Sequence, residues 1–83
     1  MWTESDNALR ATLKFADFSQ AFAFMTEVAM EAEKQDHHPE WRNVWNTVEF
    51  VLRTHSAGNT VTDKDRNLAD AISRLAKRYD ASV

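Results

Sequence analysis

The hydrophobic positions of this chain follow two different periods, and each period predicts an element. Between residues 8 and 16 apolar and polar side chains alternate, which is typical of a half-buried strand. Between residues 18 and 35 apolar side chains return every three or four positions, which predicts an amphipathic helix. Asp17 offers an N-cap for this helix, with Gln20 as the partner of a capping box. Pro39 excludes its continuation.

The second half of the chain repeats the change from strand to helix. β-Branched and aromatic side chains predict two strands, near residues 42–46 and 47–55, with a turn between them. Thr62 and Asp65 have the spacing of a capping box, ahead of a helix at about residues 63–79. The order strand-helix-strand-strand-helix predicts the α+β class, with an antiparallel sheet and helices packed on one face.

The length and composition narrow the class of protein. Eighty-three residues predict one small domain over residues 1–83. A chain of this size buries only about 60–65% of its unfolded surface, so we expect a homo-oligomer. The absence of cysteine excludes disulfides, thiol catalysis and cysteine-based zinc sites. No apolar run approaches the roughly 20 residues of a membrane span, and the acidic start has no signal-peptide core. We expect a soluble, cytoplasmic protein without a membrane partner.

The charge pattern argues against nucleic acid as a direct partner. The net charge is −3, which is unfavourable for general phosphate binding. A small basic patch could form from Arg74, Lys77 and Arg78. A solvated helix face with its cations near the helix C-terminus explains the same residues more simply.

The three histidines are the side chains best suited to chemistry. His37, His38 and His55 lie within 19 residues of one another. Imidazole exchanges protons near neutrality, because its unperturbed pKa is about 6.5. Neighbours in an extended segment point to opposite sides, so one of His37 and His38 can face a pocket while the other packs elsewhere or lines its far wall. Each histidine alone is more often an exposed residue, but the three together predict a proton-transfer site.

A metal site is the alternative interpretation of the same histidines. Three histidines can hold zinc and leave a position open for water. However, adjacent histidines are awkward ligands for one ion, and the chain has no short His-x-His or His-x₃-His spacing. Asp36, Glu33 or Asp65 would complete a ligand set only if the fold brought them together. We therefore predict no metal.

Two carboxylates and two tryptophans are candidate supporting residues. Glu33 and Asp65 are the carboxylates best placed to orient imidazoles, although Asp65 also has a structural role as a helix cap. Trp41 and Trp45 are four residues apart and would share one face of a strand. They would either pack in the core or form a flat wall for an aromatic ligand.

The residues described above resemble the signature of the pterin-4a-carbinolamine dehydratases. The resemblance spans about residues 9–75. Its most specific part is the run His37-His38-Pro39-Glu40-Trp41 followed by Thr54-His55. Further matching positions are Ala32 to Lys34, Asn43, Val44, Asn46, Val48, Leu52, Gly58, Thr62, Asp65, Leu68 and Ala69.

The resemblance implies an activity and a site. Members of the family dehydrate 4a-hydroxytetrahydropterin to quinonoid dihydropterin, without metal or organic cofactor. They recycle the pterin that aromatic amino-acid hydroxylases oxidise, and they associate as dimers or tetramers. The matching positions imply catalytic residues His37, His38 and His55, and substrate-binding residues Glu33, Trp41 and Asp65. We assign His37 and His55 to proton transfer and His38 to orienting the pterin. General acid–base catalysis of this kind raises the reaction rate by about 10²–10⁴-fold.

Three departures from the family pattern bear on these expectations. The segment from Gly58 to Thr62 is one residue longer than usual, which could shift Asp65 relative to His55. Trp45 stands where tyrosine is common. The chain also begins at the family's first tryptophan, here Trp2, where members often carry an earlier helix, and we expect either altered oligomer contacts or an exposed sheet face.

Two other functions remain open from the sequence. One is a non-catalytic or dual-role interaction protein on the same scaffold, because some relatives act as dimerisation partners of transcription factors. The other is an enzyme for a different pterin, such as one linked to molybdopterin. The presence of all three histidines favours catalysis.

Overall fold

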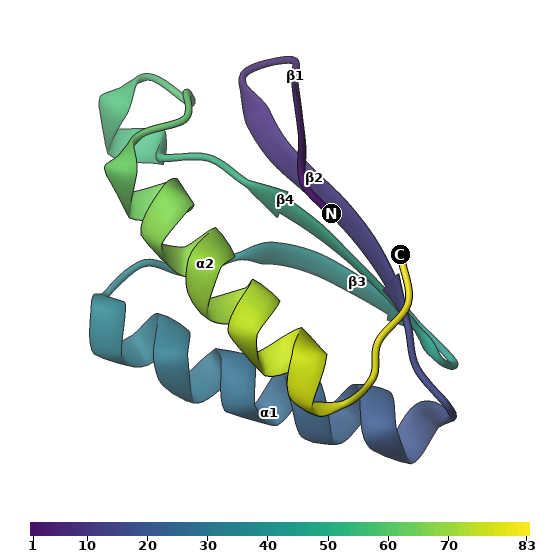
Figure 1. Cartoon of the computed structure of the whole chain (residues 1–83). Coiled ribbons are helices and arrows are strands. Elements are labelled where there is room, and N and C mark those ends of the chain that lie inside the picture. The colour runs from purple at the N-terminus through teal and green to yellow at the C-terminus, as the bar shows by residue number, and fades with distance from the viewer.

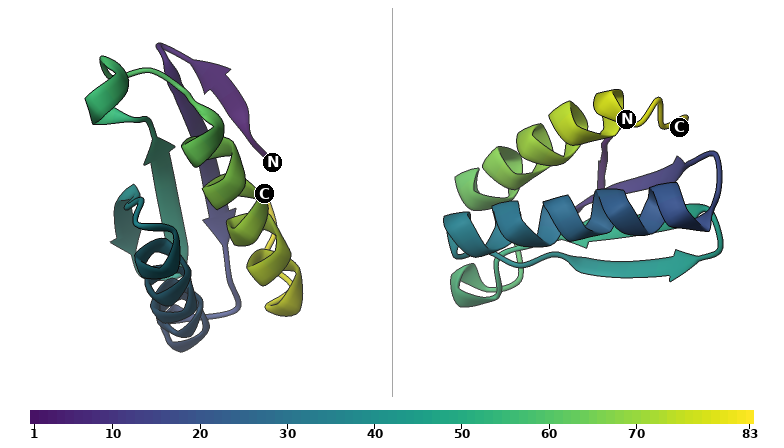
Figure 2. Two further views of the ribbon diagram at one scale, coloured as in Figure 1. Left: turned by 90° about the vertical axis from the view of Figure 1, so that its left-hand side faces the viewer. Right: turned by 90° about the horizontal axis from the view of Figure 1, so that it is seen from below.

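The computed structural model describes all 83 residues as one antiparallel sheet covered by two helices. The elements are β1 (Thr3–Ser5), β2 (Ala8–Lys14), α1 (Phe18–Gln35), β3 (Glu40–Val44), β4 (Thr47–Leu52), the short 3₁₀ helix η1 (His55–Ala57) and α2 (Asp63–Arg78). The strand order is β1-β2-β4-β3, and every neighbouring pair is antiparallel. Both helices lie on the same face of the sheet (Figures 1 and 2). The predicted α+β class is confirmed.

The strand β1 was not predicted, because its three residues carry no apolar alternation. It forms a hairpin with β2 through a two-residue turn, and both turn residues, Asp6 and Asn7, have positive φ angles. Aspartate and asparagine tolerate this conformation, which two-residue hairpin turns favour. The Asp-Asn pair is therefore the sequence signal for the missing hairpin. Trp2 fixes the start of β1, since its indole N–H donates to the Ser73 hydroxyl at 2.9 Å.

The core lies between the sheet and the helices. Alternate residues of β2 and β4 pair across the strands with their side chains buried, as in Ala11 with Phe50 and Leu13 with Val48. Helix α1 contributes Ala21, Phe24, Val28 and Ala32, and α2 contributes Leu68, Ala69, Ile72 and Ala76. The predicted strand and helix periods are both reproduced in this buried set. No helix of the structure has the length and apolar character needed to cross a membrane.

Both helices begin where their caps predict. The Asp17 carboxylate accepts a hydrogen bond from the Gln20 backbone N–H at 2.8 Å. Thr62 and Asp65 form both halves of a capping box at the start of α2. Helix α1 ends earlier than Pro39 requires, because Asp36 adopts a left-handed conformation with φ 51° and its N–H bonds to carbonyls of the last turn.

The β3–β4 hairpin corrects the expectation for the second tryptophan. The strands run over Glu40–Val44 and Thr47–Leu52, so Trp45 lies in the turn and not in a strand. Its side chain is 66% exposed and its φ angle is 50°. Trp45 therefore shares no face with Trp41, whose ring packs against Phe50. The side-chain amide of Asn43 donates to the Trp45 carbonyl and holds the turn.

The extra residue in the loop before α2 changes the conformation of that loop only. Gly58 and Asn59 adopt successive left-handed conformations, with φ 83° and 58°. The chain then returns to Thr54, whose N–H donates to the Thr60 carbonyl at 2.9 Å. The extra residue therefore does not separate Asp65 from the His55 segment, because Asp65 still bonds to Thr54.

Candidate functional site

The three histidines line one hollow at the end of the helical layer. His37 and His38 follow the C-terminus of α1, and His55 begins η1 directly after β4. The hollow has a volume of about 290 Å³ and is lined only by polar and charged side chains. Its lining residues are Asp36, His37, His38, Thr54, His55, Ser56 and Lys64. The fold thus brings together imidazoles that are 17 or 18 positions apart in the sequence.

His37 is the most firmly held of the three histidines. Its Nε2 lies 2.6 Å from Oδ1 of Asp65, and its side chain is only 12% exposed. Asp65 comes from the first turn of α2 and is completely buried. This contact joins the C-terminal end of one helix to the N-terminal end of the other. Because Nε2 is engaged, Nδ1 is the ring nitrogen of His37 that remains for a ligand.

Asp65 is a buried carboxylate, and both of its oxygens accept hydrogen bonds. Its Oδ2 accepts hydrogen bonds from the Thr54 hydroxyl at 2.8 Å and from the Thr62 backbone N–H at 2.9 Å. Burial acts to raise the pKa of Asp65, but the hydrogen bonds from His37, Thr62 and Thr54 and the charge of His37 outweigh it. The pKa of Asp65 therefore lies below its ordinary value, and the group is ionised near neutral pH.

His38 faces the same hollow from an exposed position. Its Nε2 lies 2.8 Å from Oε1 of Glu33, and both side chains are mostly exposed, at 61% and 80%. An exposed pair of this kind is worth about 0–1 kcal/mol. The contact orients the His38 ring without fixing it as firmly as Asp65 fixes His37.

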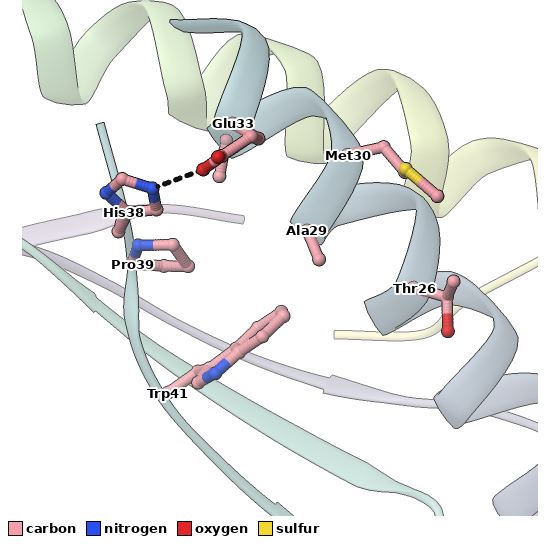
Figure 3. A pocket seen from close by; sticks show the side chains of 8 residues that line it. Thr26, Ala29, Met30, Glu33, His38, Pro39 and Trp41 are labelled. Carbon is pink, nitrogen blue, oxygen red and sulfur yellow. Dashed lines mark hydrogen bonds and ion pairs between the residues drawn. The ribbon is translucent and has the colours of Figure 1, made fainter. Parts of the chain in front are cut away.

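A second hollow adjoins the first at His38. It has a volume of about 460 Å³ and lies between α1 and the segment that leads into β3 (Figure 3). Trp41 and Pro39 form one wall, and Ala29 on α1 lies opposite the indole (Figure 3). Glu33 and Trp41 belong to this hollow and not to the one that the three histidines share. Of the predicted supporting residues, Asp65 and Glu33 each contact a histidine of the first hollow, whereas Trp41 contacts none of its three histidines through a hydrogen bond.

His55 differs from the other two histidines in having no protein partner. Its side chain is exposed and makes no hydrogen bond to the protein. The same hollow includes Lys64, which forms no ion pair. Ser56 and Asp36 also line it. Sequence reasoning did not select Lys64, Ser56 or Thr54 as site residues. Thr54 belongs to the Thr54-His55 part of the family signature, whereas the only signal for Lys64 and Ser56 is their proximity to Asp65 and His55 in the sequence.

The donor set favours proton transfer over metal binding. No three histidine, aspartate or glutamate side chains converge in the arrangement that holds a metal ion. The two histidine–carboxylate contacts are instead separate, since Asp65 contacts His37 and Glu33 contacts His38. The hollow combines one firmly held imidazole, one loosely held imidazole and one free imidazole. Such a set can accept a proton at one point and donate a proton at another.

Comparisons with known proteins show which family this chain resembles. A family model described as pterin 4 alpha carbinolamine dehydratase matches residues 1–75. A Nitrobacter hamburgensis protein, provisionally named as a pterin-4-alpha-carbinolamine dehydratase, is 50% identical over 80 residues, which cover 94% of this chain and 78% of the relative. A Bradyrhizobium protein (strain ORS 278) with the same provisional name is 56% identical over 77 residues, covering 90% of this chain and 76% of the relative.

Two solved structures share the fold. A Brucella melitensis protein described as a transcriptional coactivator/pterin dehydratase superposes with a TM-score of 0.86 at 45% identity, covering 90% of this chain and 81% of that one. A pterin dehydratase-like protein described as a RuBisCO assembly factor in the alpha-carboxysome has a TM-score of 0.73 at 21% identity, covering 92% and 87%. The second likeness concerns the fold alone. Together with the family match over most of its length, these findings show that the chain belongs to the pterin 4 alpha carbinolamine dehydratase family.

Proposed function

We propose that this protein dehydrates a 4a-hydroxytetrahydropterin to the quinonoid dihydropterin, with release of water. The observation that carries the proposal is the shared hollow of His37, His38 and His55, in a chain of this family. Its volume of about 290 Å³ is near the lower end of the range for small-molecule pockets, about 300–1,000 Å³. A bicyclic pterin is a ligand of suitable size for such a hollow.

The reaction needs one proton donor and one proton acceptor. The bond between C4a and the hydroxyl oxygen breaks, and the oxygen takes a proton and leaves as water. The lone pair of N5 forms the new double bond to C4a, and a ring N–H proton passes to a base. No oxidant or reductant is consumed, because the atoms lost are those of water. Two imidazoles in opposite protonation states suit this chemistry at neutral pH.

We assign the proton-transfer roles to His37 and His55. The buried carboxylate of Asp65 favours His37 as the base, because an anion at 2.6 Å stabilises the imidazolium that forms. His55 has no protein partner and is open to solvent, which suits an acid that is reprotonated from water in each cycle. His38 would orient the pterin, supported by Glu33, while Trp41 would contact the ligand from the adjoining hollow.

The test is a direct assay with synthetic 4a-hydroxytetrahydropterin. His37→Ala and His55→Ala should each lower the dehydration rate by about 10²-fold or more, and His38→Ala should act mainly on KM. Lys77→Ala, on the last turn of α2 and outside the hollow, is the control and should leave the rate unchanged. An inactive wild-type protein would overturn the proposed function. A rate abolished by His38→Ala but hardly changed by the other two would overturn the assignment of roles.

We also propose that the chain forms a homodimer or homotetramer through the outer face of α1. Phe18, Phe22 and Met30 on this helix are 49%, 55% and 67% exposed. The rings of Phe18 and Phe22 lie 5.7 Å apart, so the exposed apolar surface is continuous there. A two-fold symmetric contact would bury the same surface on both copies. Sedimentation should show weaker association for Phe22→Ser than for the control Val83→Ser, and unchanged association would exclude this face.

The same face favours a second role in binding a protein partner. The Brucella relative is described as both a coactivator and a dehydratase, so one scaffold is credited with both roles. The recycling role would link this protein to an aromatic amino-acid hydroxylase in the cytoplasm. A Phe22→Ser variant that kept its dehydration rate would separate any partner binding from catalysis.

A further inference from the structure

A row of hydrogen bonds runs from the start of α2 to His37. The Lys64 backbone N–H donates to the Thr62 hydroxyl at 3.3 Å. The Thr62 and Thr54 hydroxyl oxygens lie 2.7 Å apart, and the Thr54 hydroxyl lies 2.8 Å from Oδ2 of Asp65. Asp65 then meets His37 through its other oxygen at 2.6 Å. Thr54 is 4% exposed and Asp65 is fully buried, so solvent does not compete for these bonds.

The protons in this row can point in only one direction. Asp65 is ionised and can only accept, so the single hydroxyl proton of Thr54 must be donated to it. Thr54 then has no proton left for Thr62, and the Thr62 hydroxyl must be the donor between the two. Thr62 in turn accepts from the Lys64 backbone. The direction of each hydrogen bond in the row is therefore fixed. Reversing the bond between Thr54 and Thr62 would remove the hydroxyl hydrogen that Thr54 donates to Asp65.

The ionised carboxylate of Asp65 also fixes the position of the proton on His37. An ionised carboxylate accepts at Oδ1, so Nε2 of His37 must carry the hydrogen. In the neutral ring the other nitrogen, Nδ1, is then the proton acceptor. Oδ2 is filled by Thr54 and by the Thr62 N–H, which leaves Oδ1 to His37 alone.

The geometry points to Thr54 and Thr62 as positioning residues that set the tautomer of His37 through Asp65 and so present Nδ1 as the catalytic base. This inference rests on the proposed function only in giving His37 the role of base. Thr54 has a second effect, because it directly precedes His55 and its carbonyl accepts from the backbone N–H groups of Ala57 and Asn59. One residue therefore holds the base and fixes the turn that carries the proposed acid.

Several charged groups surround His37 and enter the pH dependence. Asp65 and Lys64 face it from α2, and Asp36 precedes it at the end of α1. The two other imidazoles, His38 and His55, lie in the same hollow. A variant that removes only a neutral hydroxyl leaves all these charges in place. Its effect on the pH profile would then report the hydrogen-bond row and not a lost charge.

The experiment compares Thr54→Val, Thr54→Ser and Thr60→Val. Valine matches threonine in shape without the hydroxyl, serine keeps the hydroxyl, and the Thr60 side chain, in the same loop, makes no hydrogen bond. Ring ¹⁵N signals of His37, assigned with a His37→Ala variant, report which nitrogen carries the proton. Steady-state kinetics over pH 5–9 report kcat and KM separately.

Thr54→Val should lower kcat by about tenfold or more, as part of the roughly 10²–10⁴-fold supplied by acid–base catalysis. KM should change little and the acid limb of the pH profile should move. Without the Thr54 bond at Oδ2 the Asp65 carboxylate can turn away from Nε2 of His37, so the His37 signals should show a mixture of tautomers. Thr54→Ser should restore wild-type kinetics and signals, and Thr60→Val should match the wild type. A wild-type tautomer and wild-type kcat in Thr54→Val would overturn the inference.

Two further measurements keep the inference testable. If Thr54→Val does not fold, Thr62→Gly replaces it, because glycine is nearly as good an N-cap but has no hydroxyl. It should shift the His37 signals in the same direction, and unshifted signals would overturn the inference. If the wild-type protein does not dehydrate the pterin, the proposed function fails. The ¹⁵N signals would still decide whether Thr54 and Thr62 set the tautomer.

Discussion

Replacing Asp65 by asparagine tests the buried carboxylate that joins the two helices. The variant keeps the shape of the side chain but removes its charge. Asp65 accepts hydrogen bonds from His37, Thr54 and the Thr62 backbone at 2.6, 2.8 and 2.9 Å. A hydrogen bond to a charged group contributes about 1.5–3 kcal/mol and a neutral one about 0.5–1.5 kcal/mol. The loss is therefore about 1 kcal/mol per bond and about 3 kcal/mol in all.

The pH dependence of this loss follows from the lowered pKa of Asp65. Burial acts to raise that pKa, but the hydrogen bonds and the charge of His37 hold it below the ordinary value of 3.8. At pH values between the pKa of Asp65 in the folded state and 3.8, the unfolded chain binds more protons than the folded one. The free energy of unfolding therefore rises with pH over this range. The contribution of Asp65 is complete above pH 3.8 and is lost as the pH falls through the folded pKa. The difference between wild type and Asp65→Asn should shrink accordingly in acid.

Urea unfolding at pH 7 and at pH 3 measures both effects. The control is Asp63→Asn, which removes an exposed carboxylate from the same helical turn and should change the free energy of unfolding by less than about 0.5 kcal/mol. A loss below 1 kcal/mol for Asp65→Asn at pH 7 would refute the reasoning from the three hydrogen bonds. A loss that does not shrink between pH 7 and pH 3 would refute the reasoning from the pKa.

Three other changes test the fold. Phe24→Ala should lower the free energy of unfolding by about 3–5 kcal/mol in urea titrations, because this ring is fully buried; the exposed Phe22→Ala should cost far less in the same assay. The hydrogen bond from Tyr79 to Glu27 and the burial of the phenol raise the pKa of Tyr79. Glu27→Gln should therefore move the phenolate absorbance, which comes from the single tyrosine, to lower pH. Trp45→Gly should raise the thermal midpoint, since φ is 50° and left-handed geometry costs a non-glycine residue about 1–2 kcal/mol; an unchanged or lower midpoint would contradict this.

The sequence by itself determined the elements whose signals are local. Helix caps depend on side chains within three residues of one another, and Asp17 and Thr62 mark both helix starts for that reason. The alternation that defines β2 is likewise a property of neighbouring positions. β1 was missed because three polar residues carry no periodic signal, and its strand exists through pairing with β2.

Only the tertiary structure decided which groups meet. The sequence marked Glu33 and Asp65 as partners for imidazoles, but the pairing of Asp65 with His37 spans 28 residues and depends on how α2 packs against α1. The position of β3 beside α1 places Trp41 at a second hollow, while the hairpin turn places Trp45 in solvent. Local propensity sets the conformation of the helices and of β2, whereas the arrangement of buried surfaces sets the distances between segments. The hydrogen-bond row to His37 belongs to the second kind, since its members come from a helix start, a strand end and a helix end.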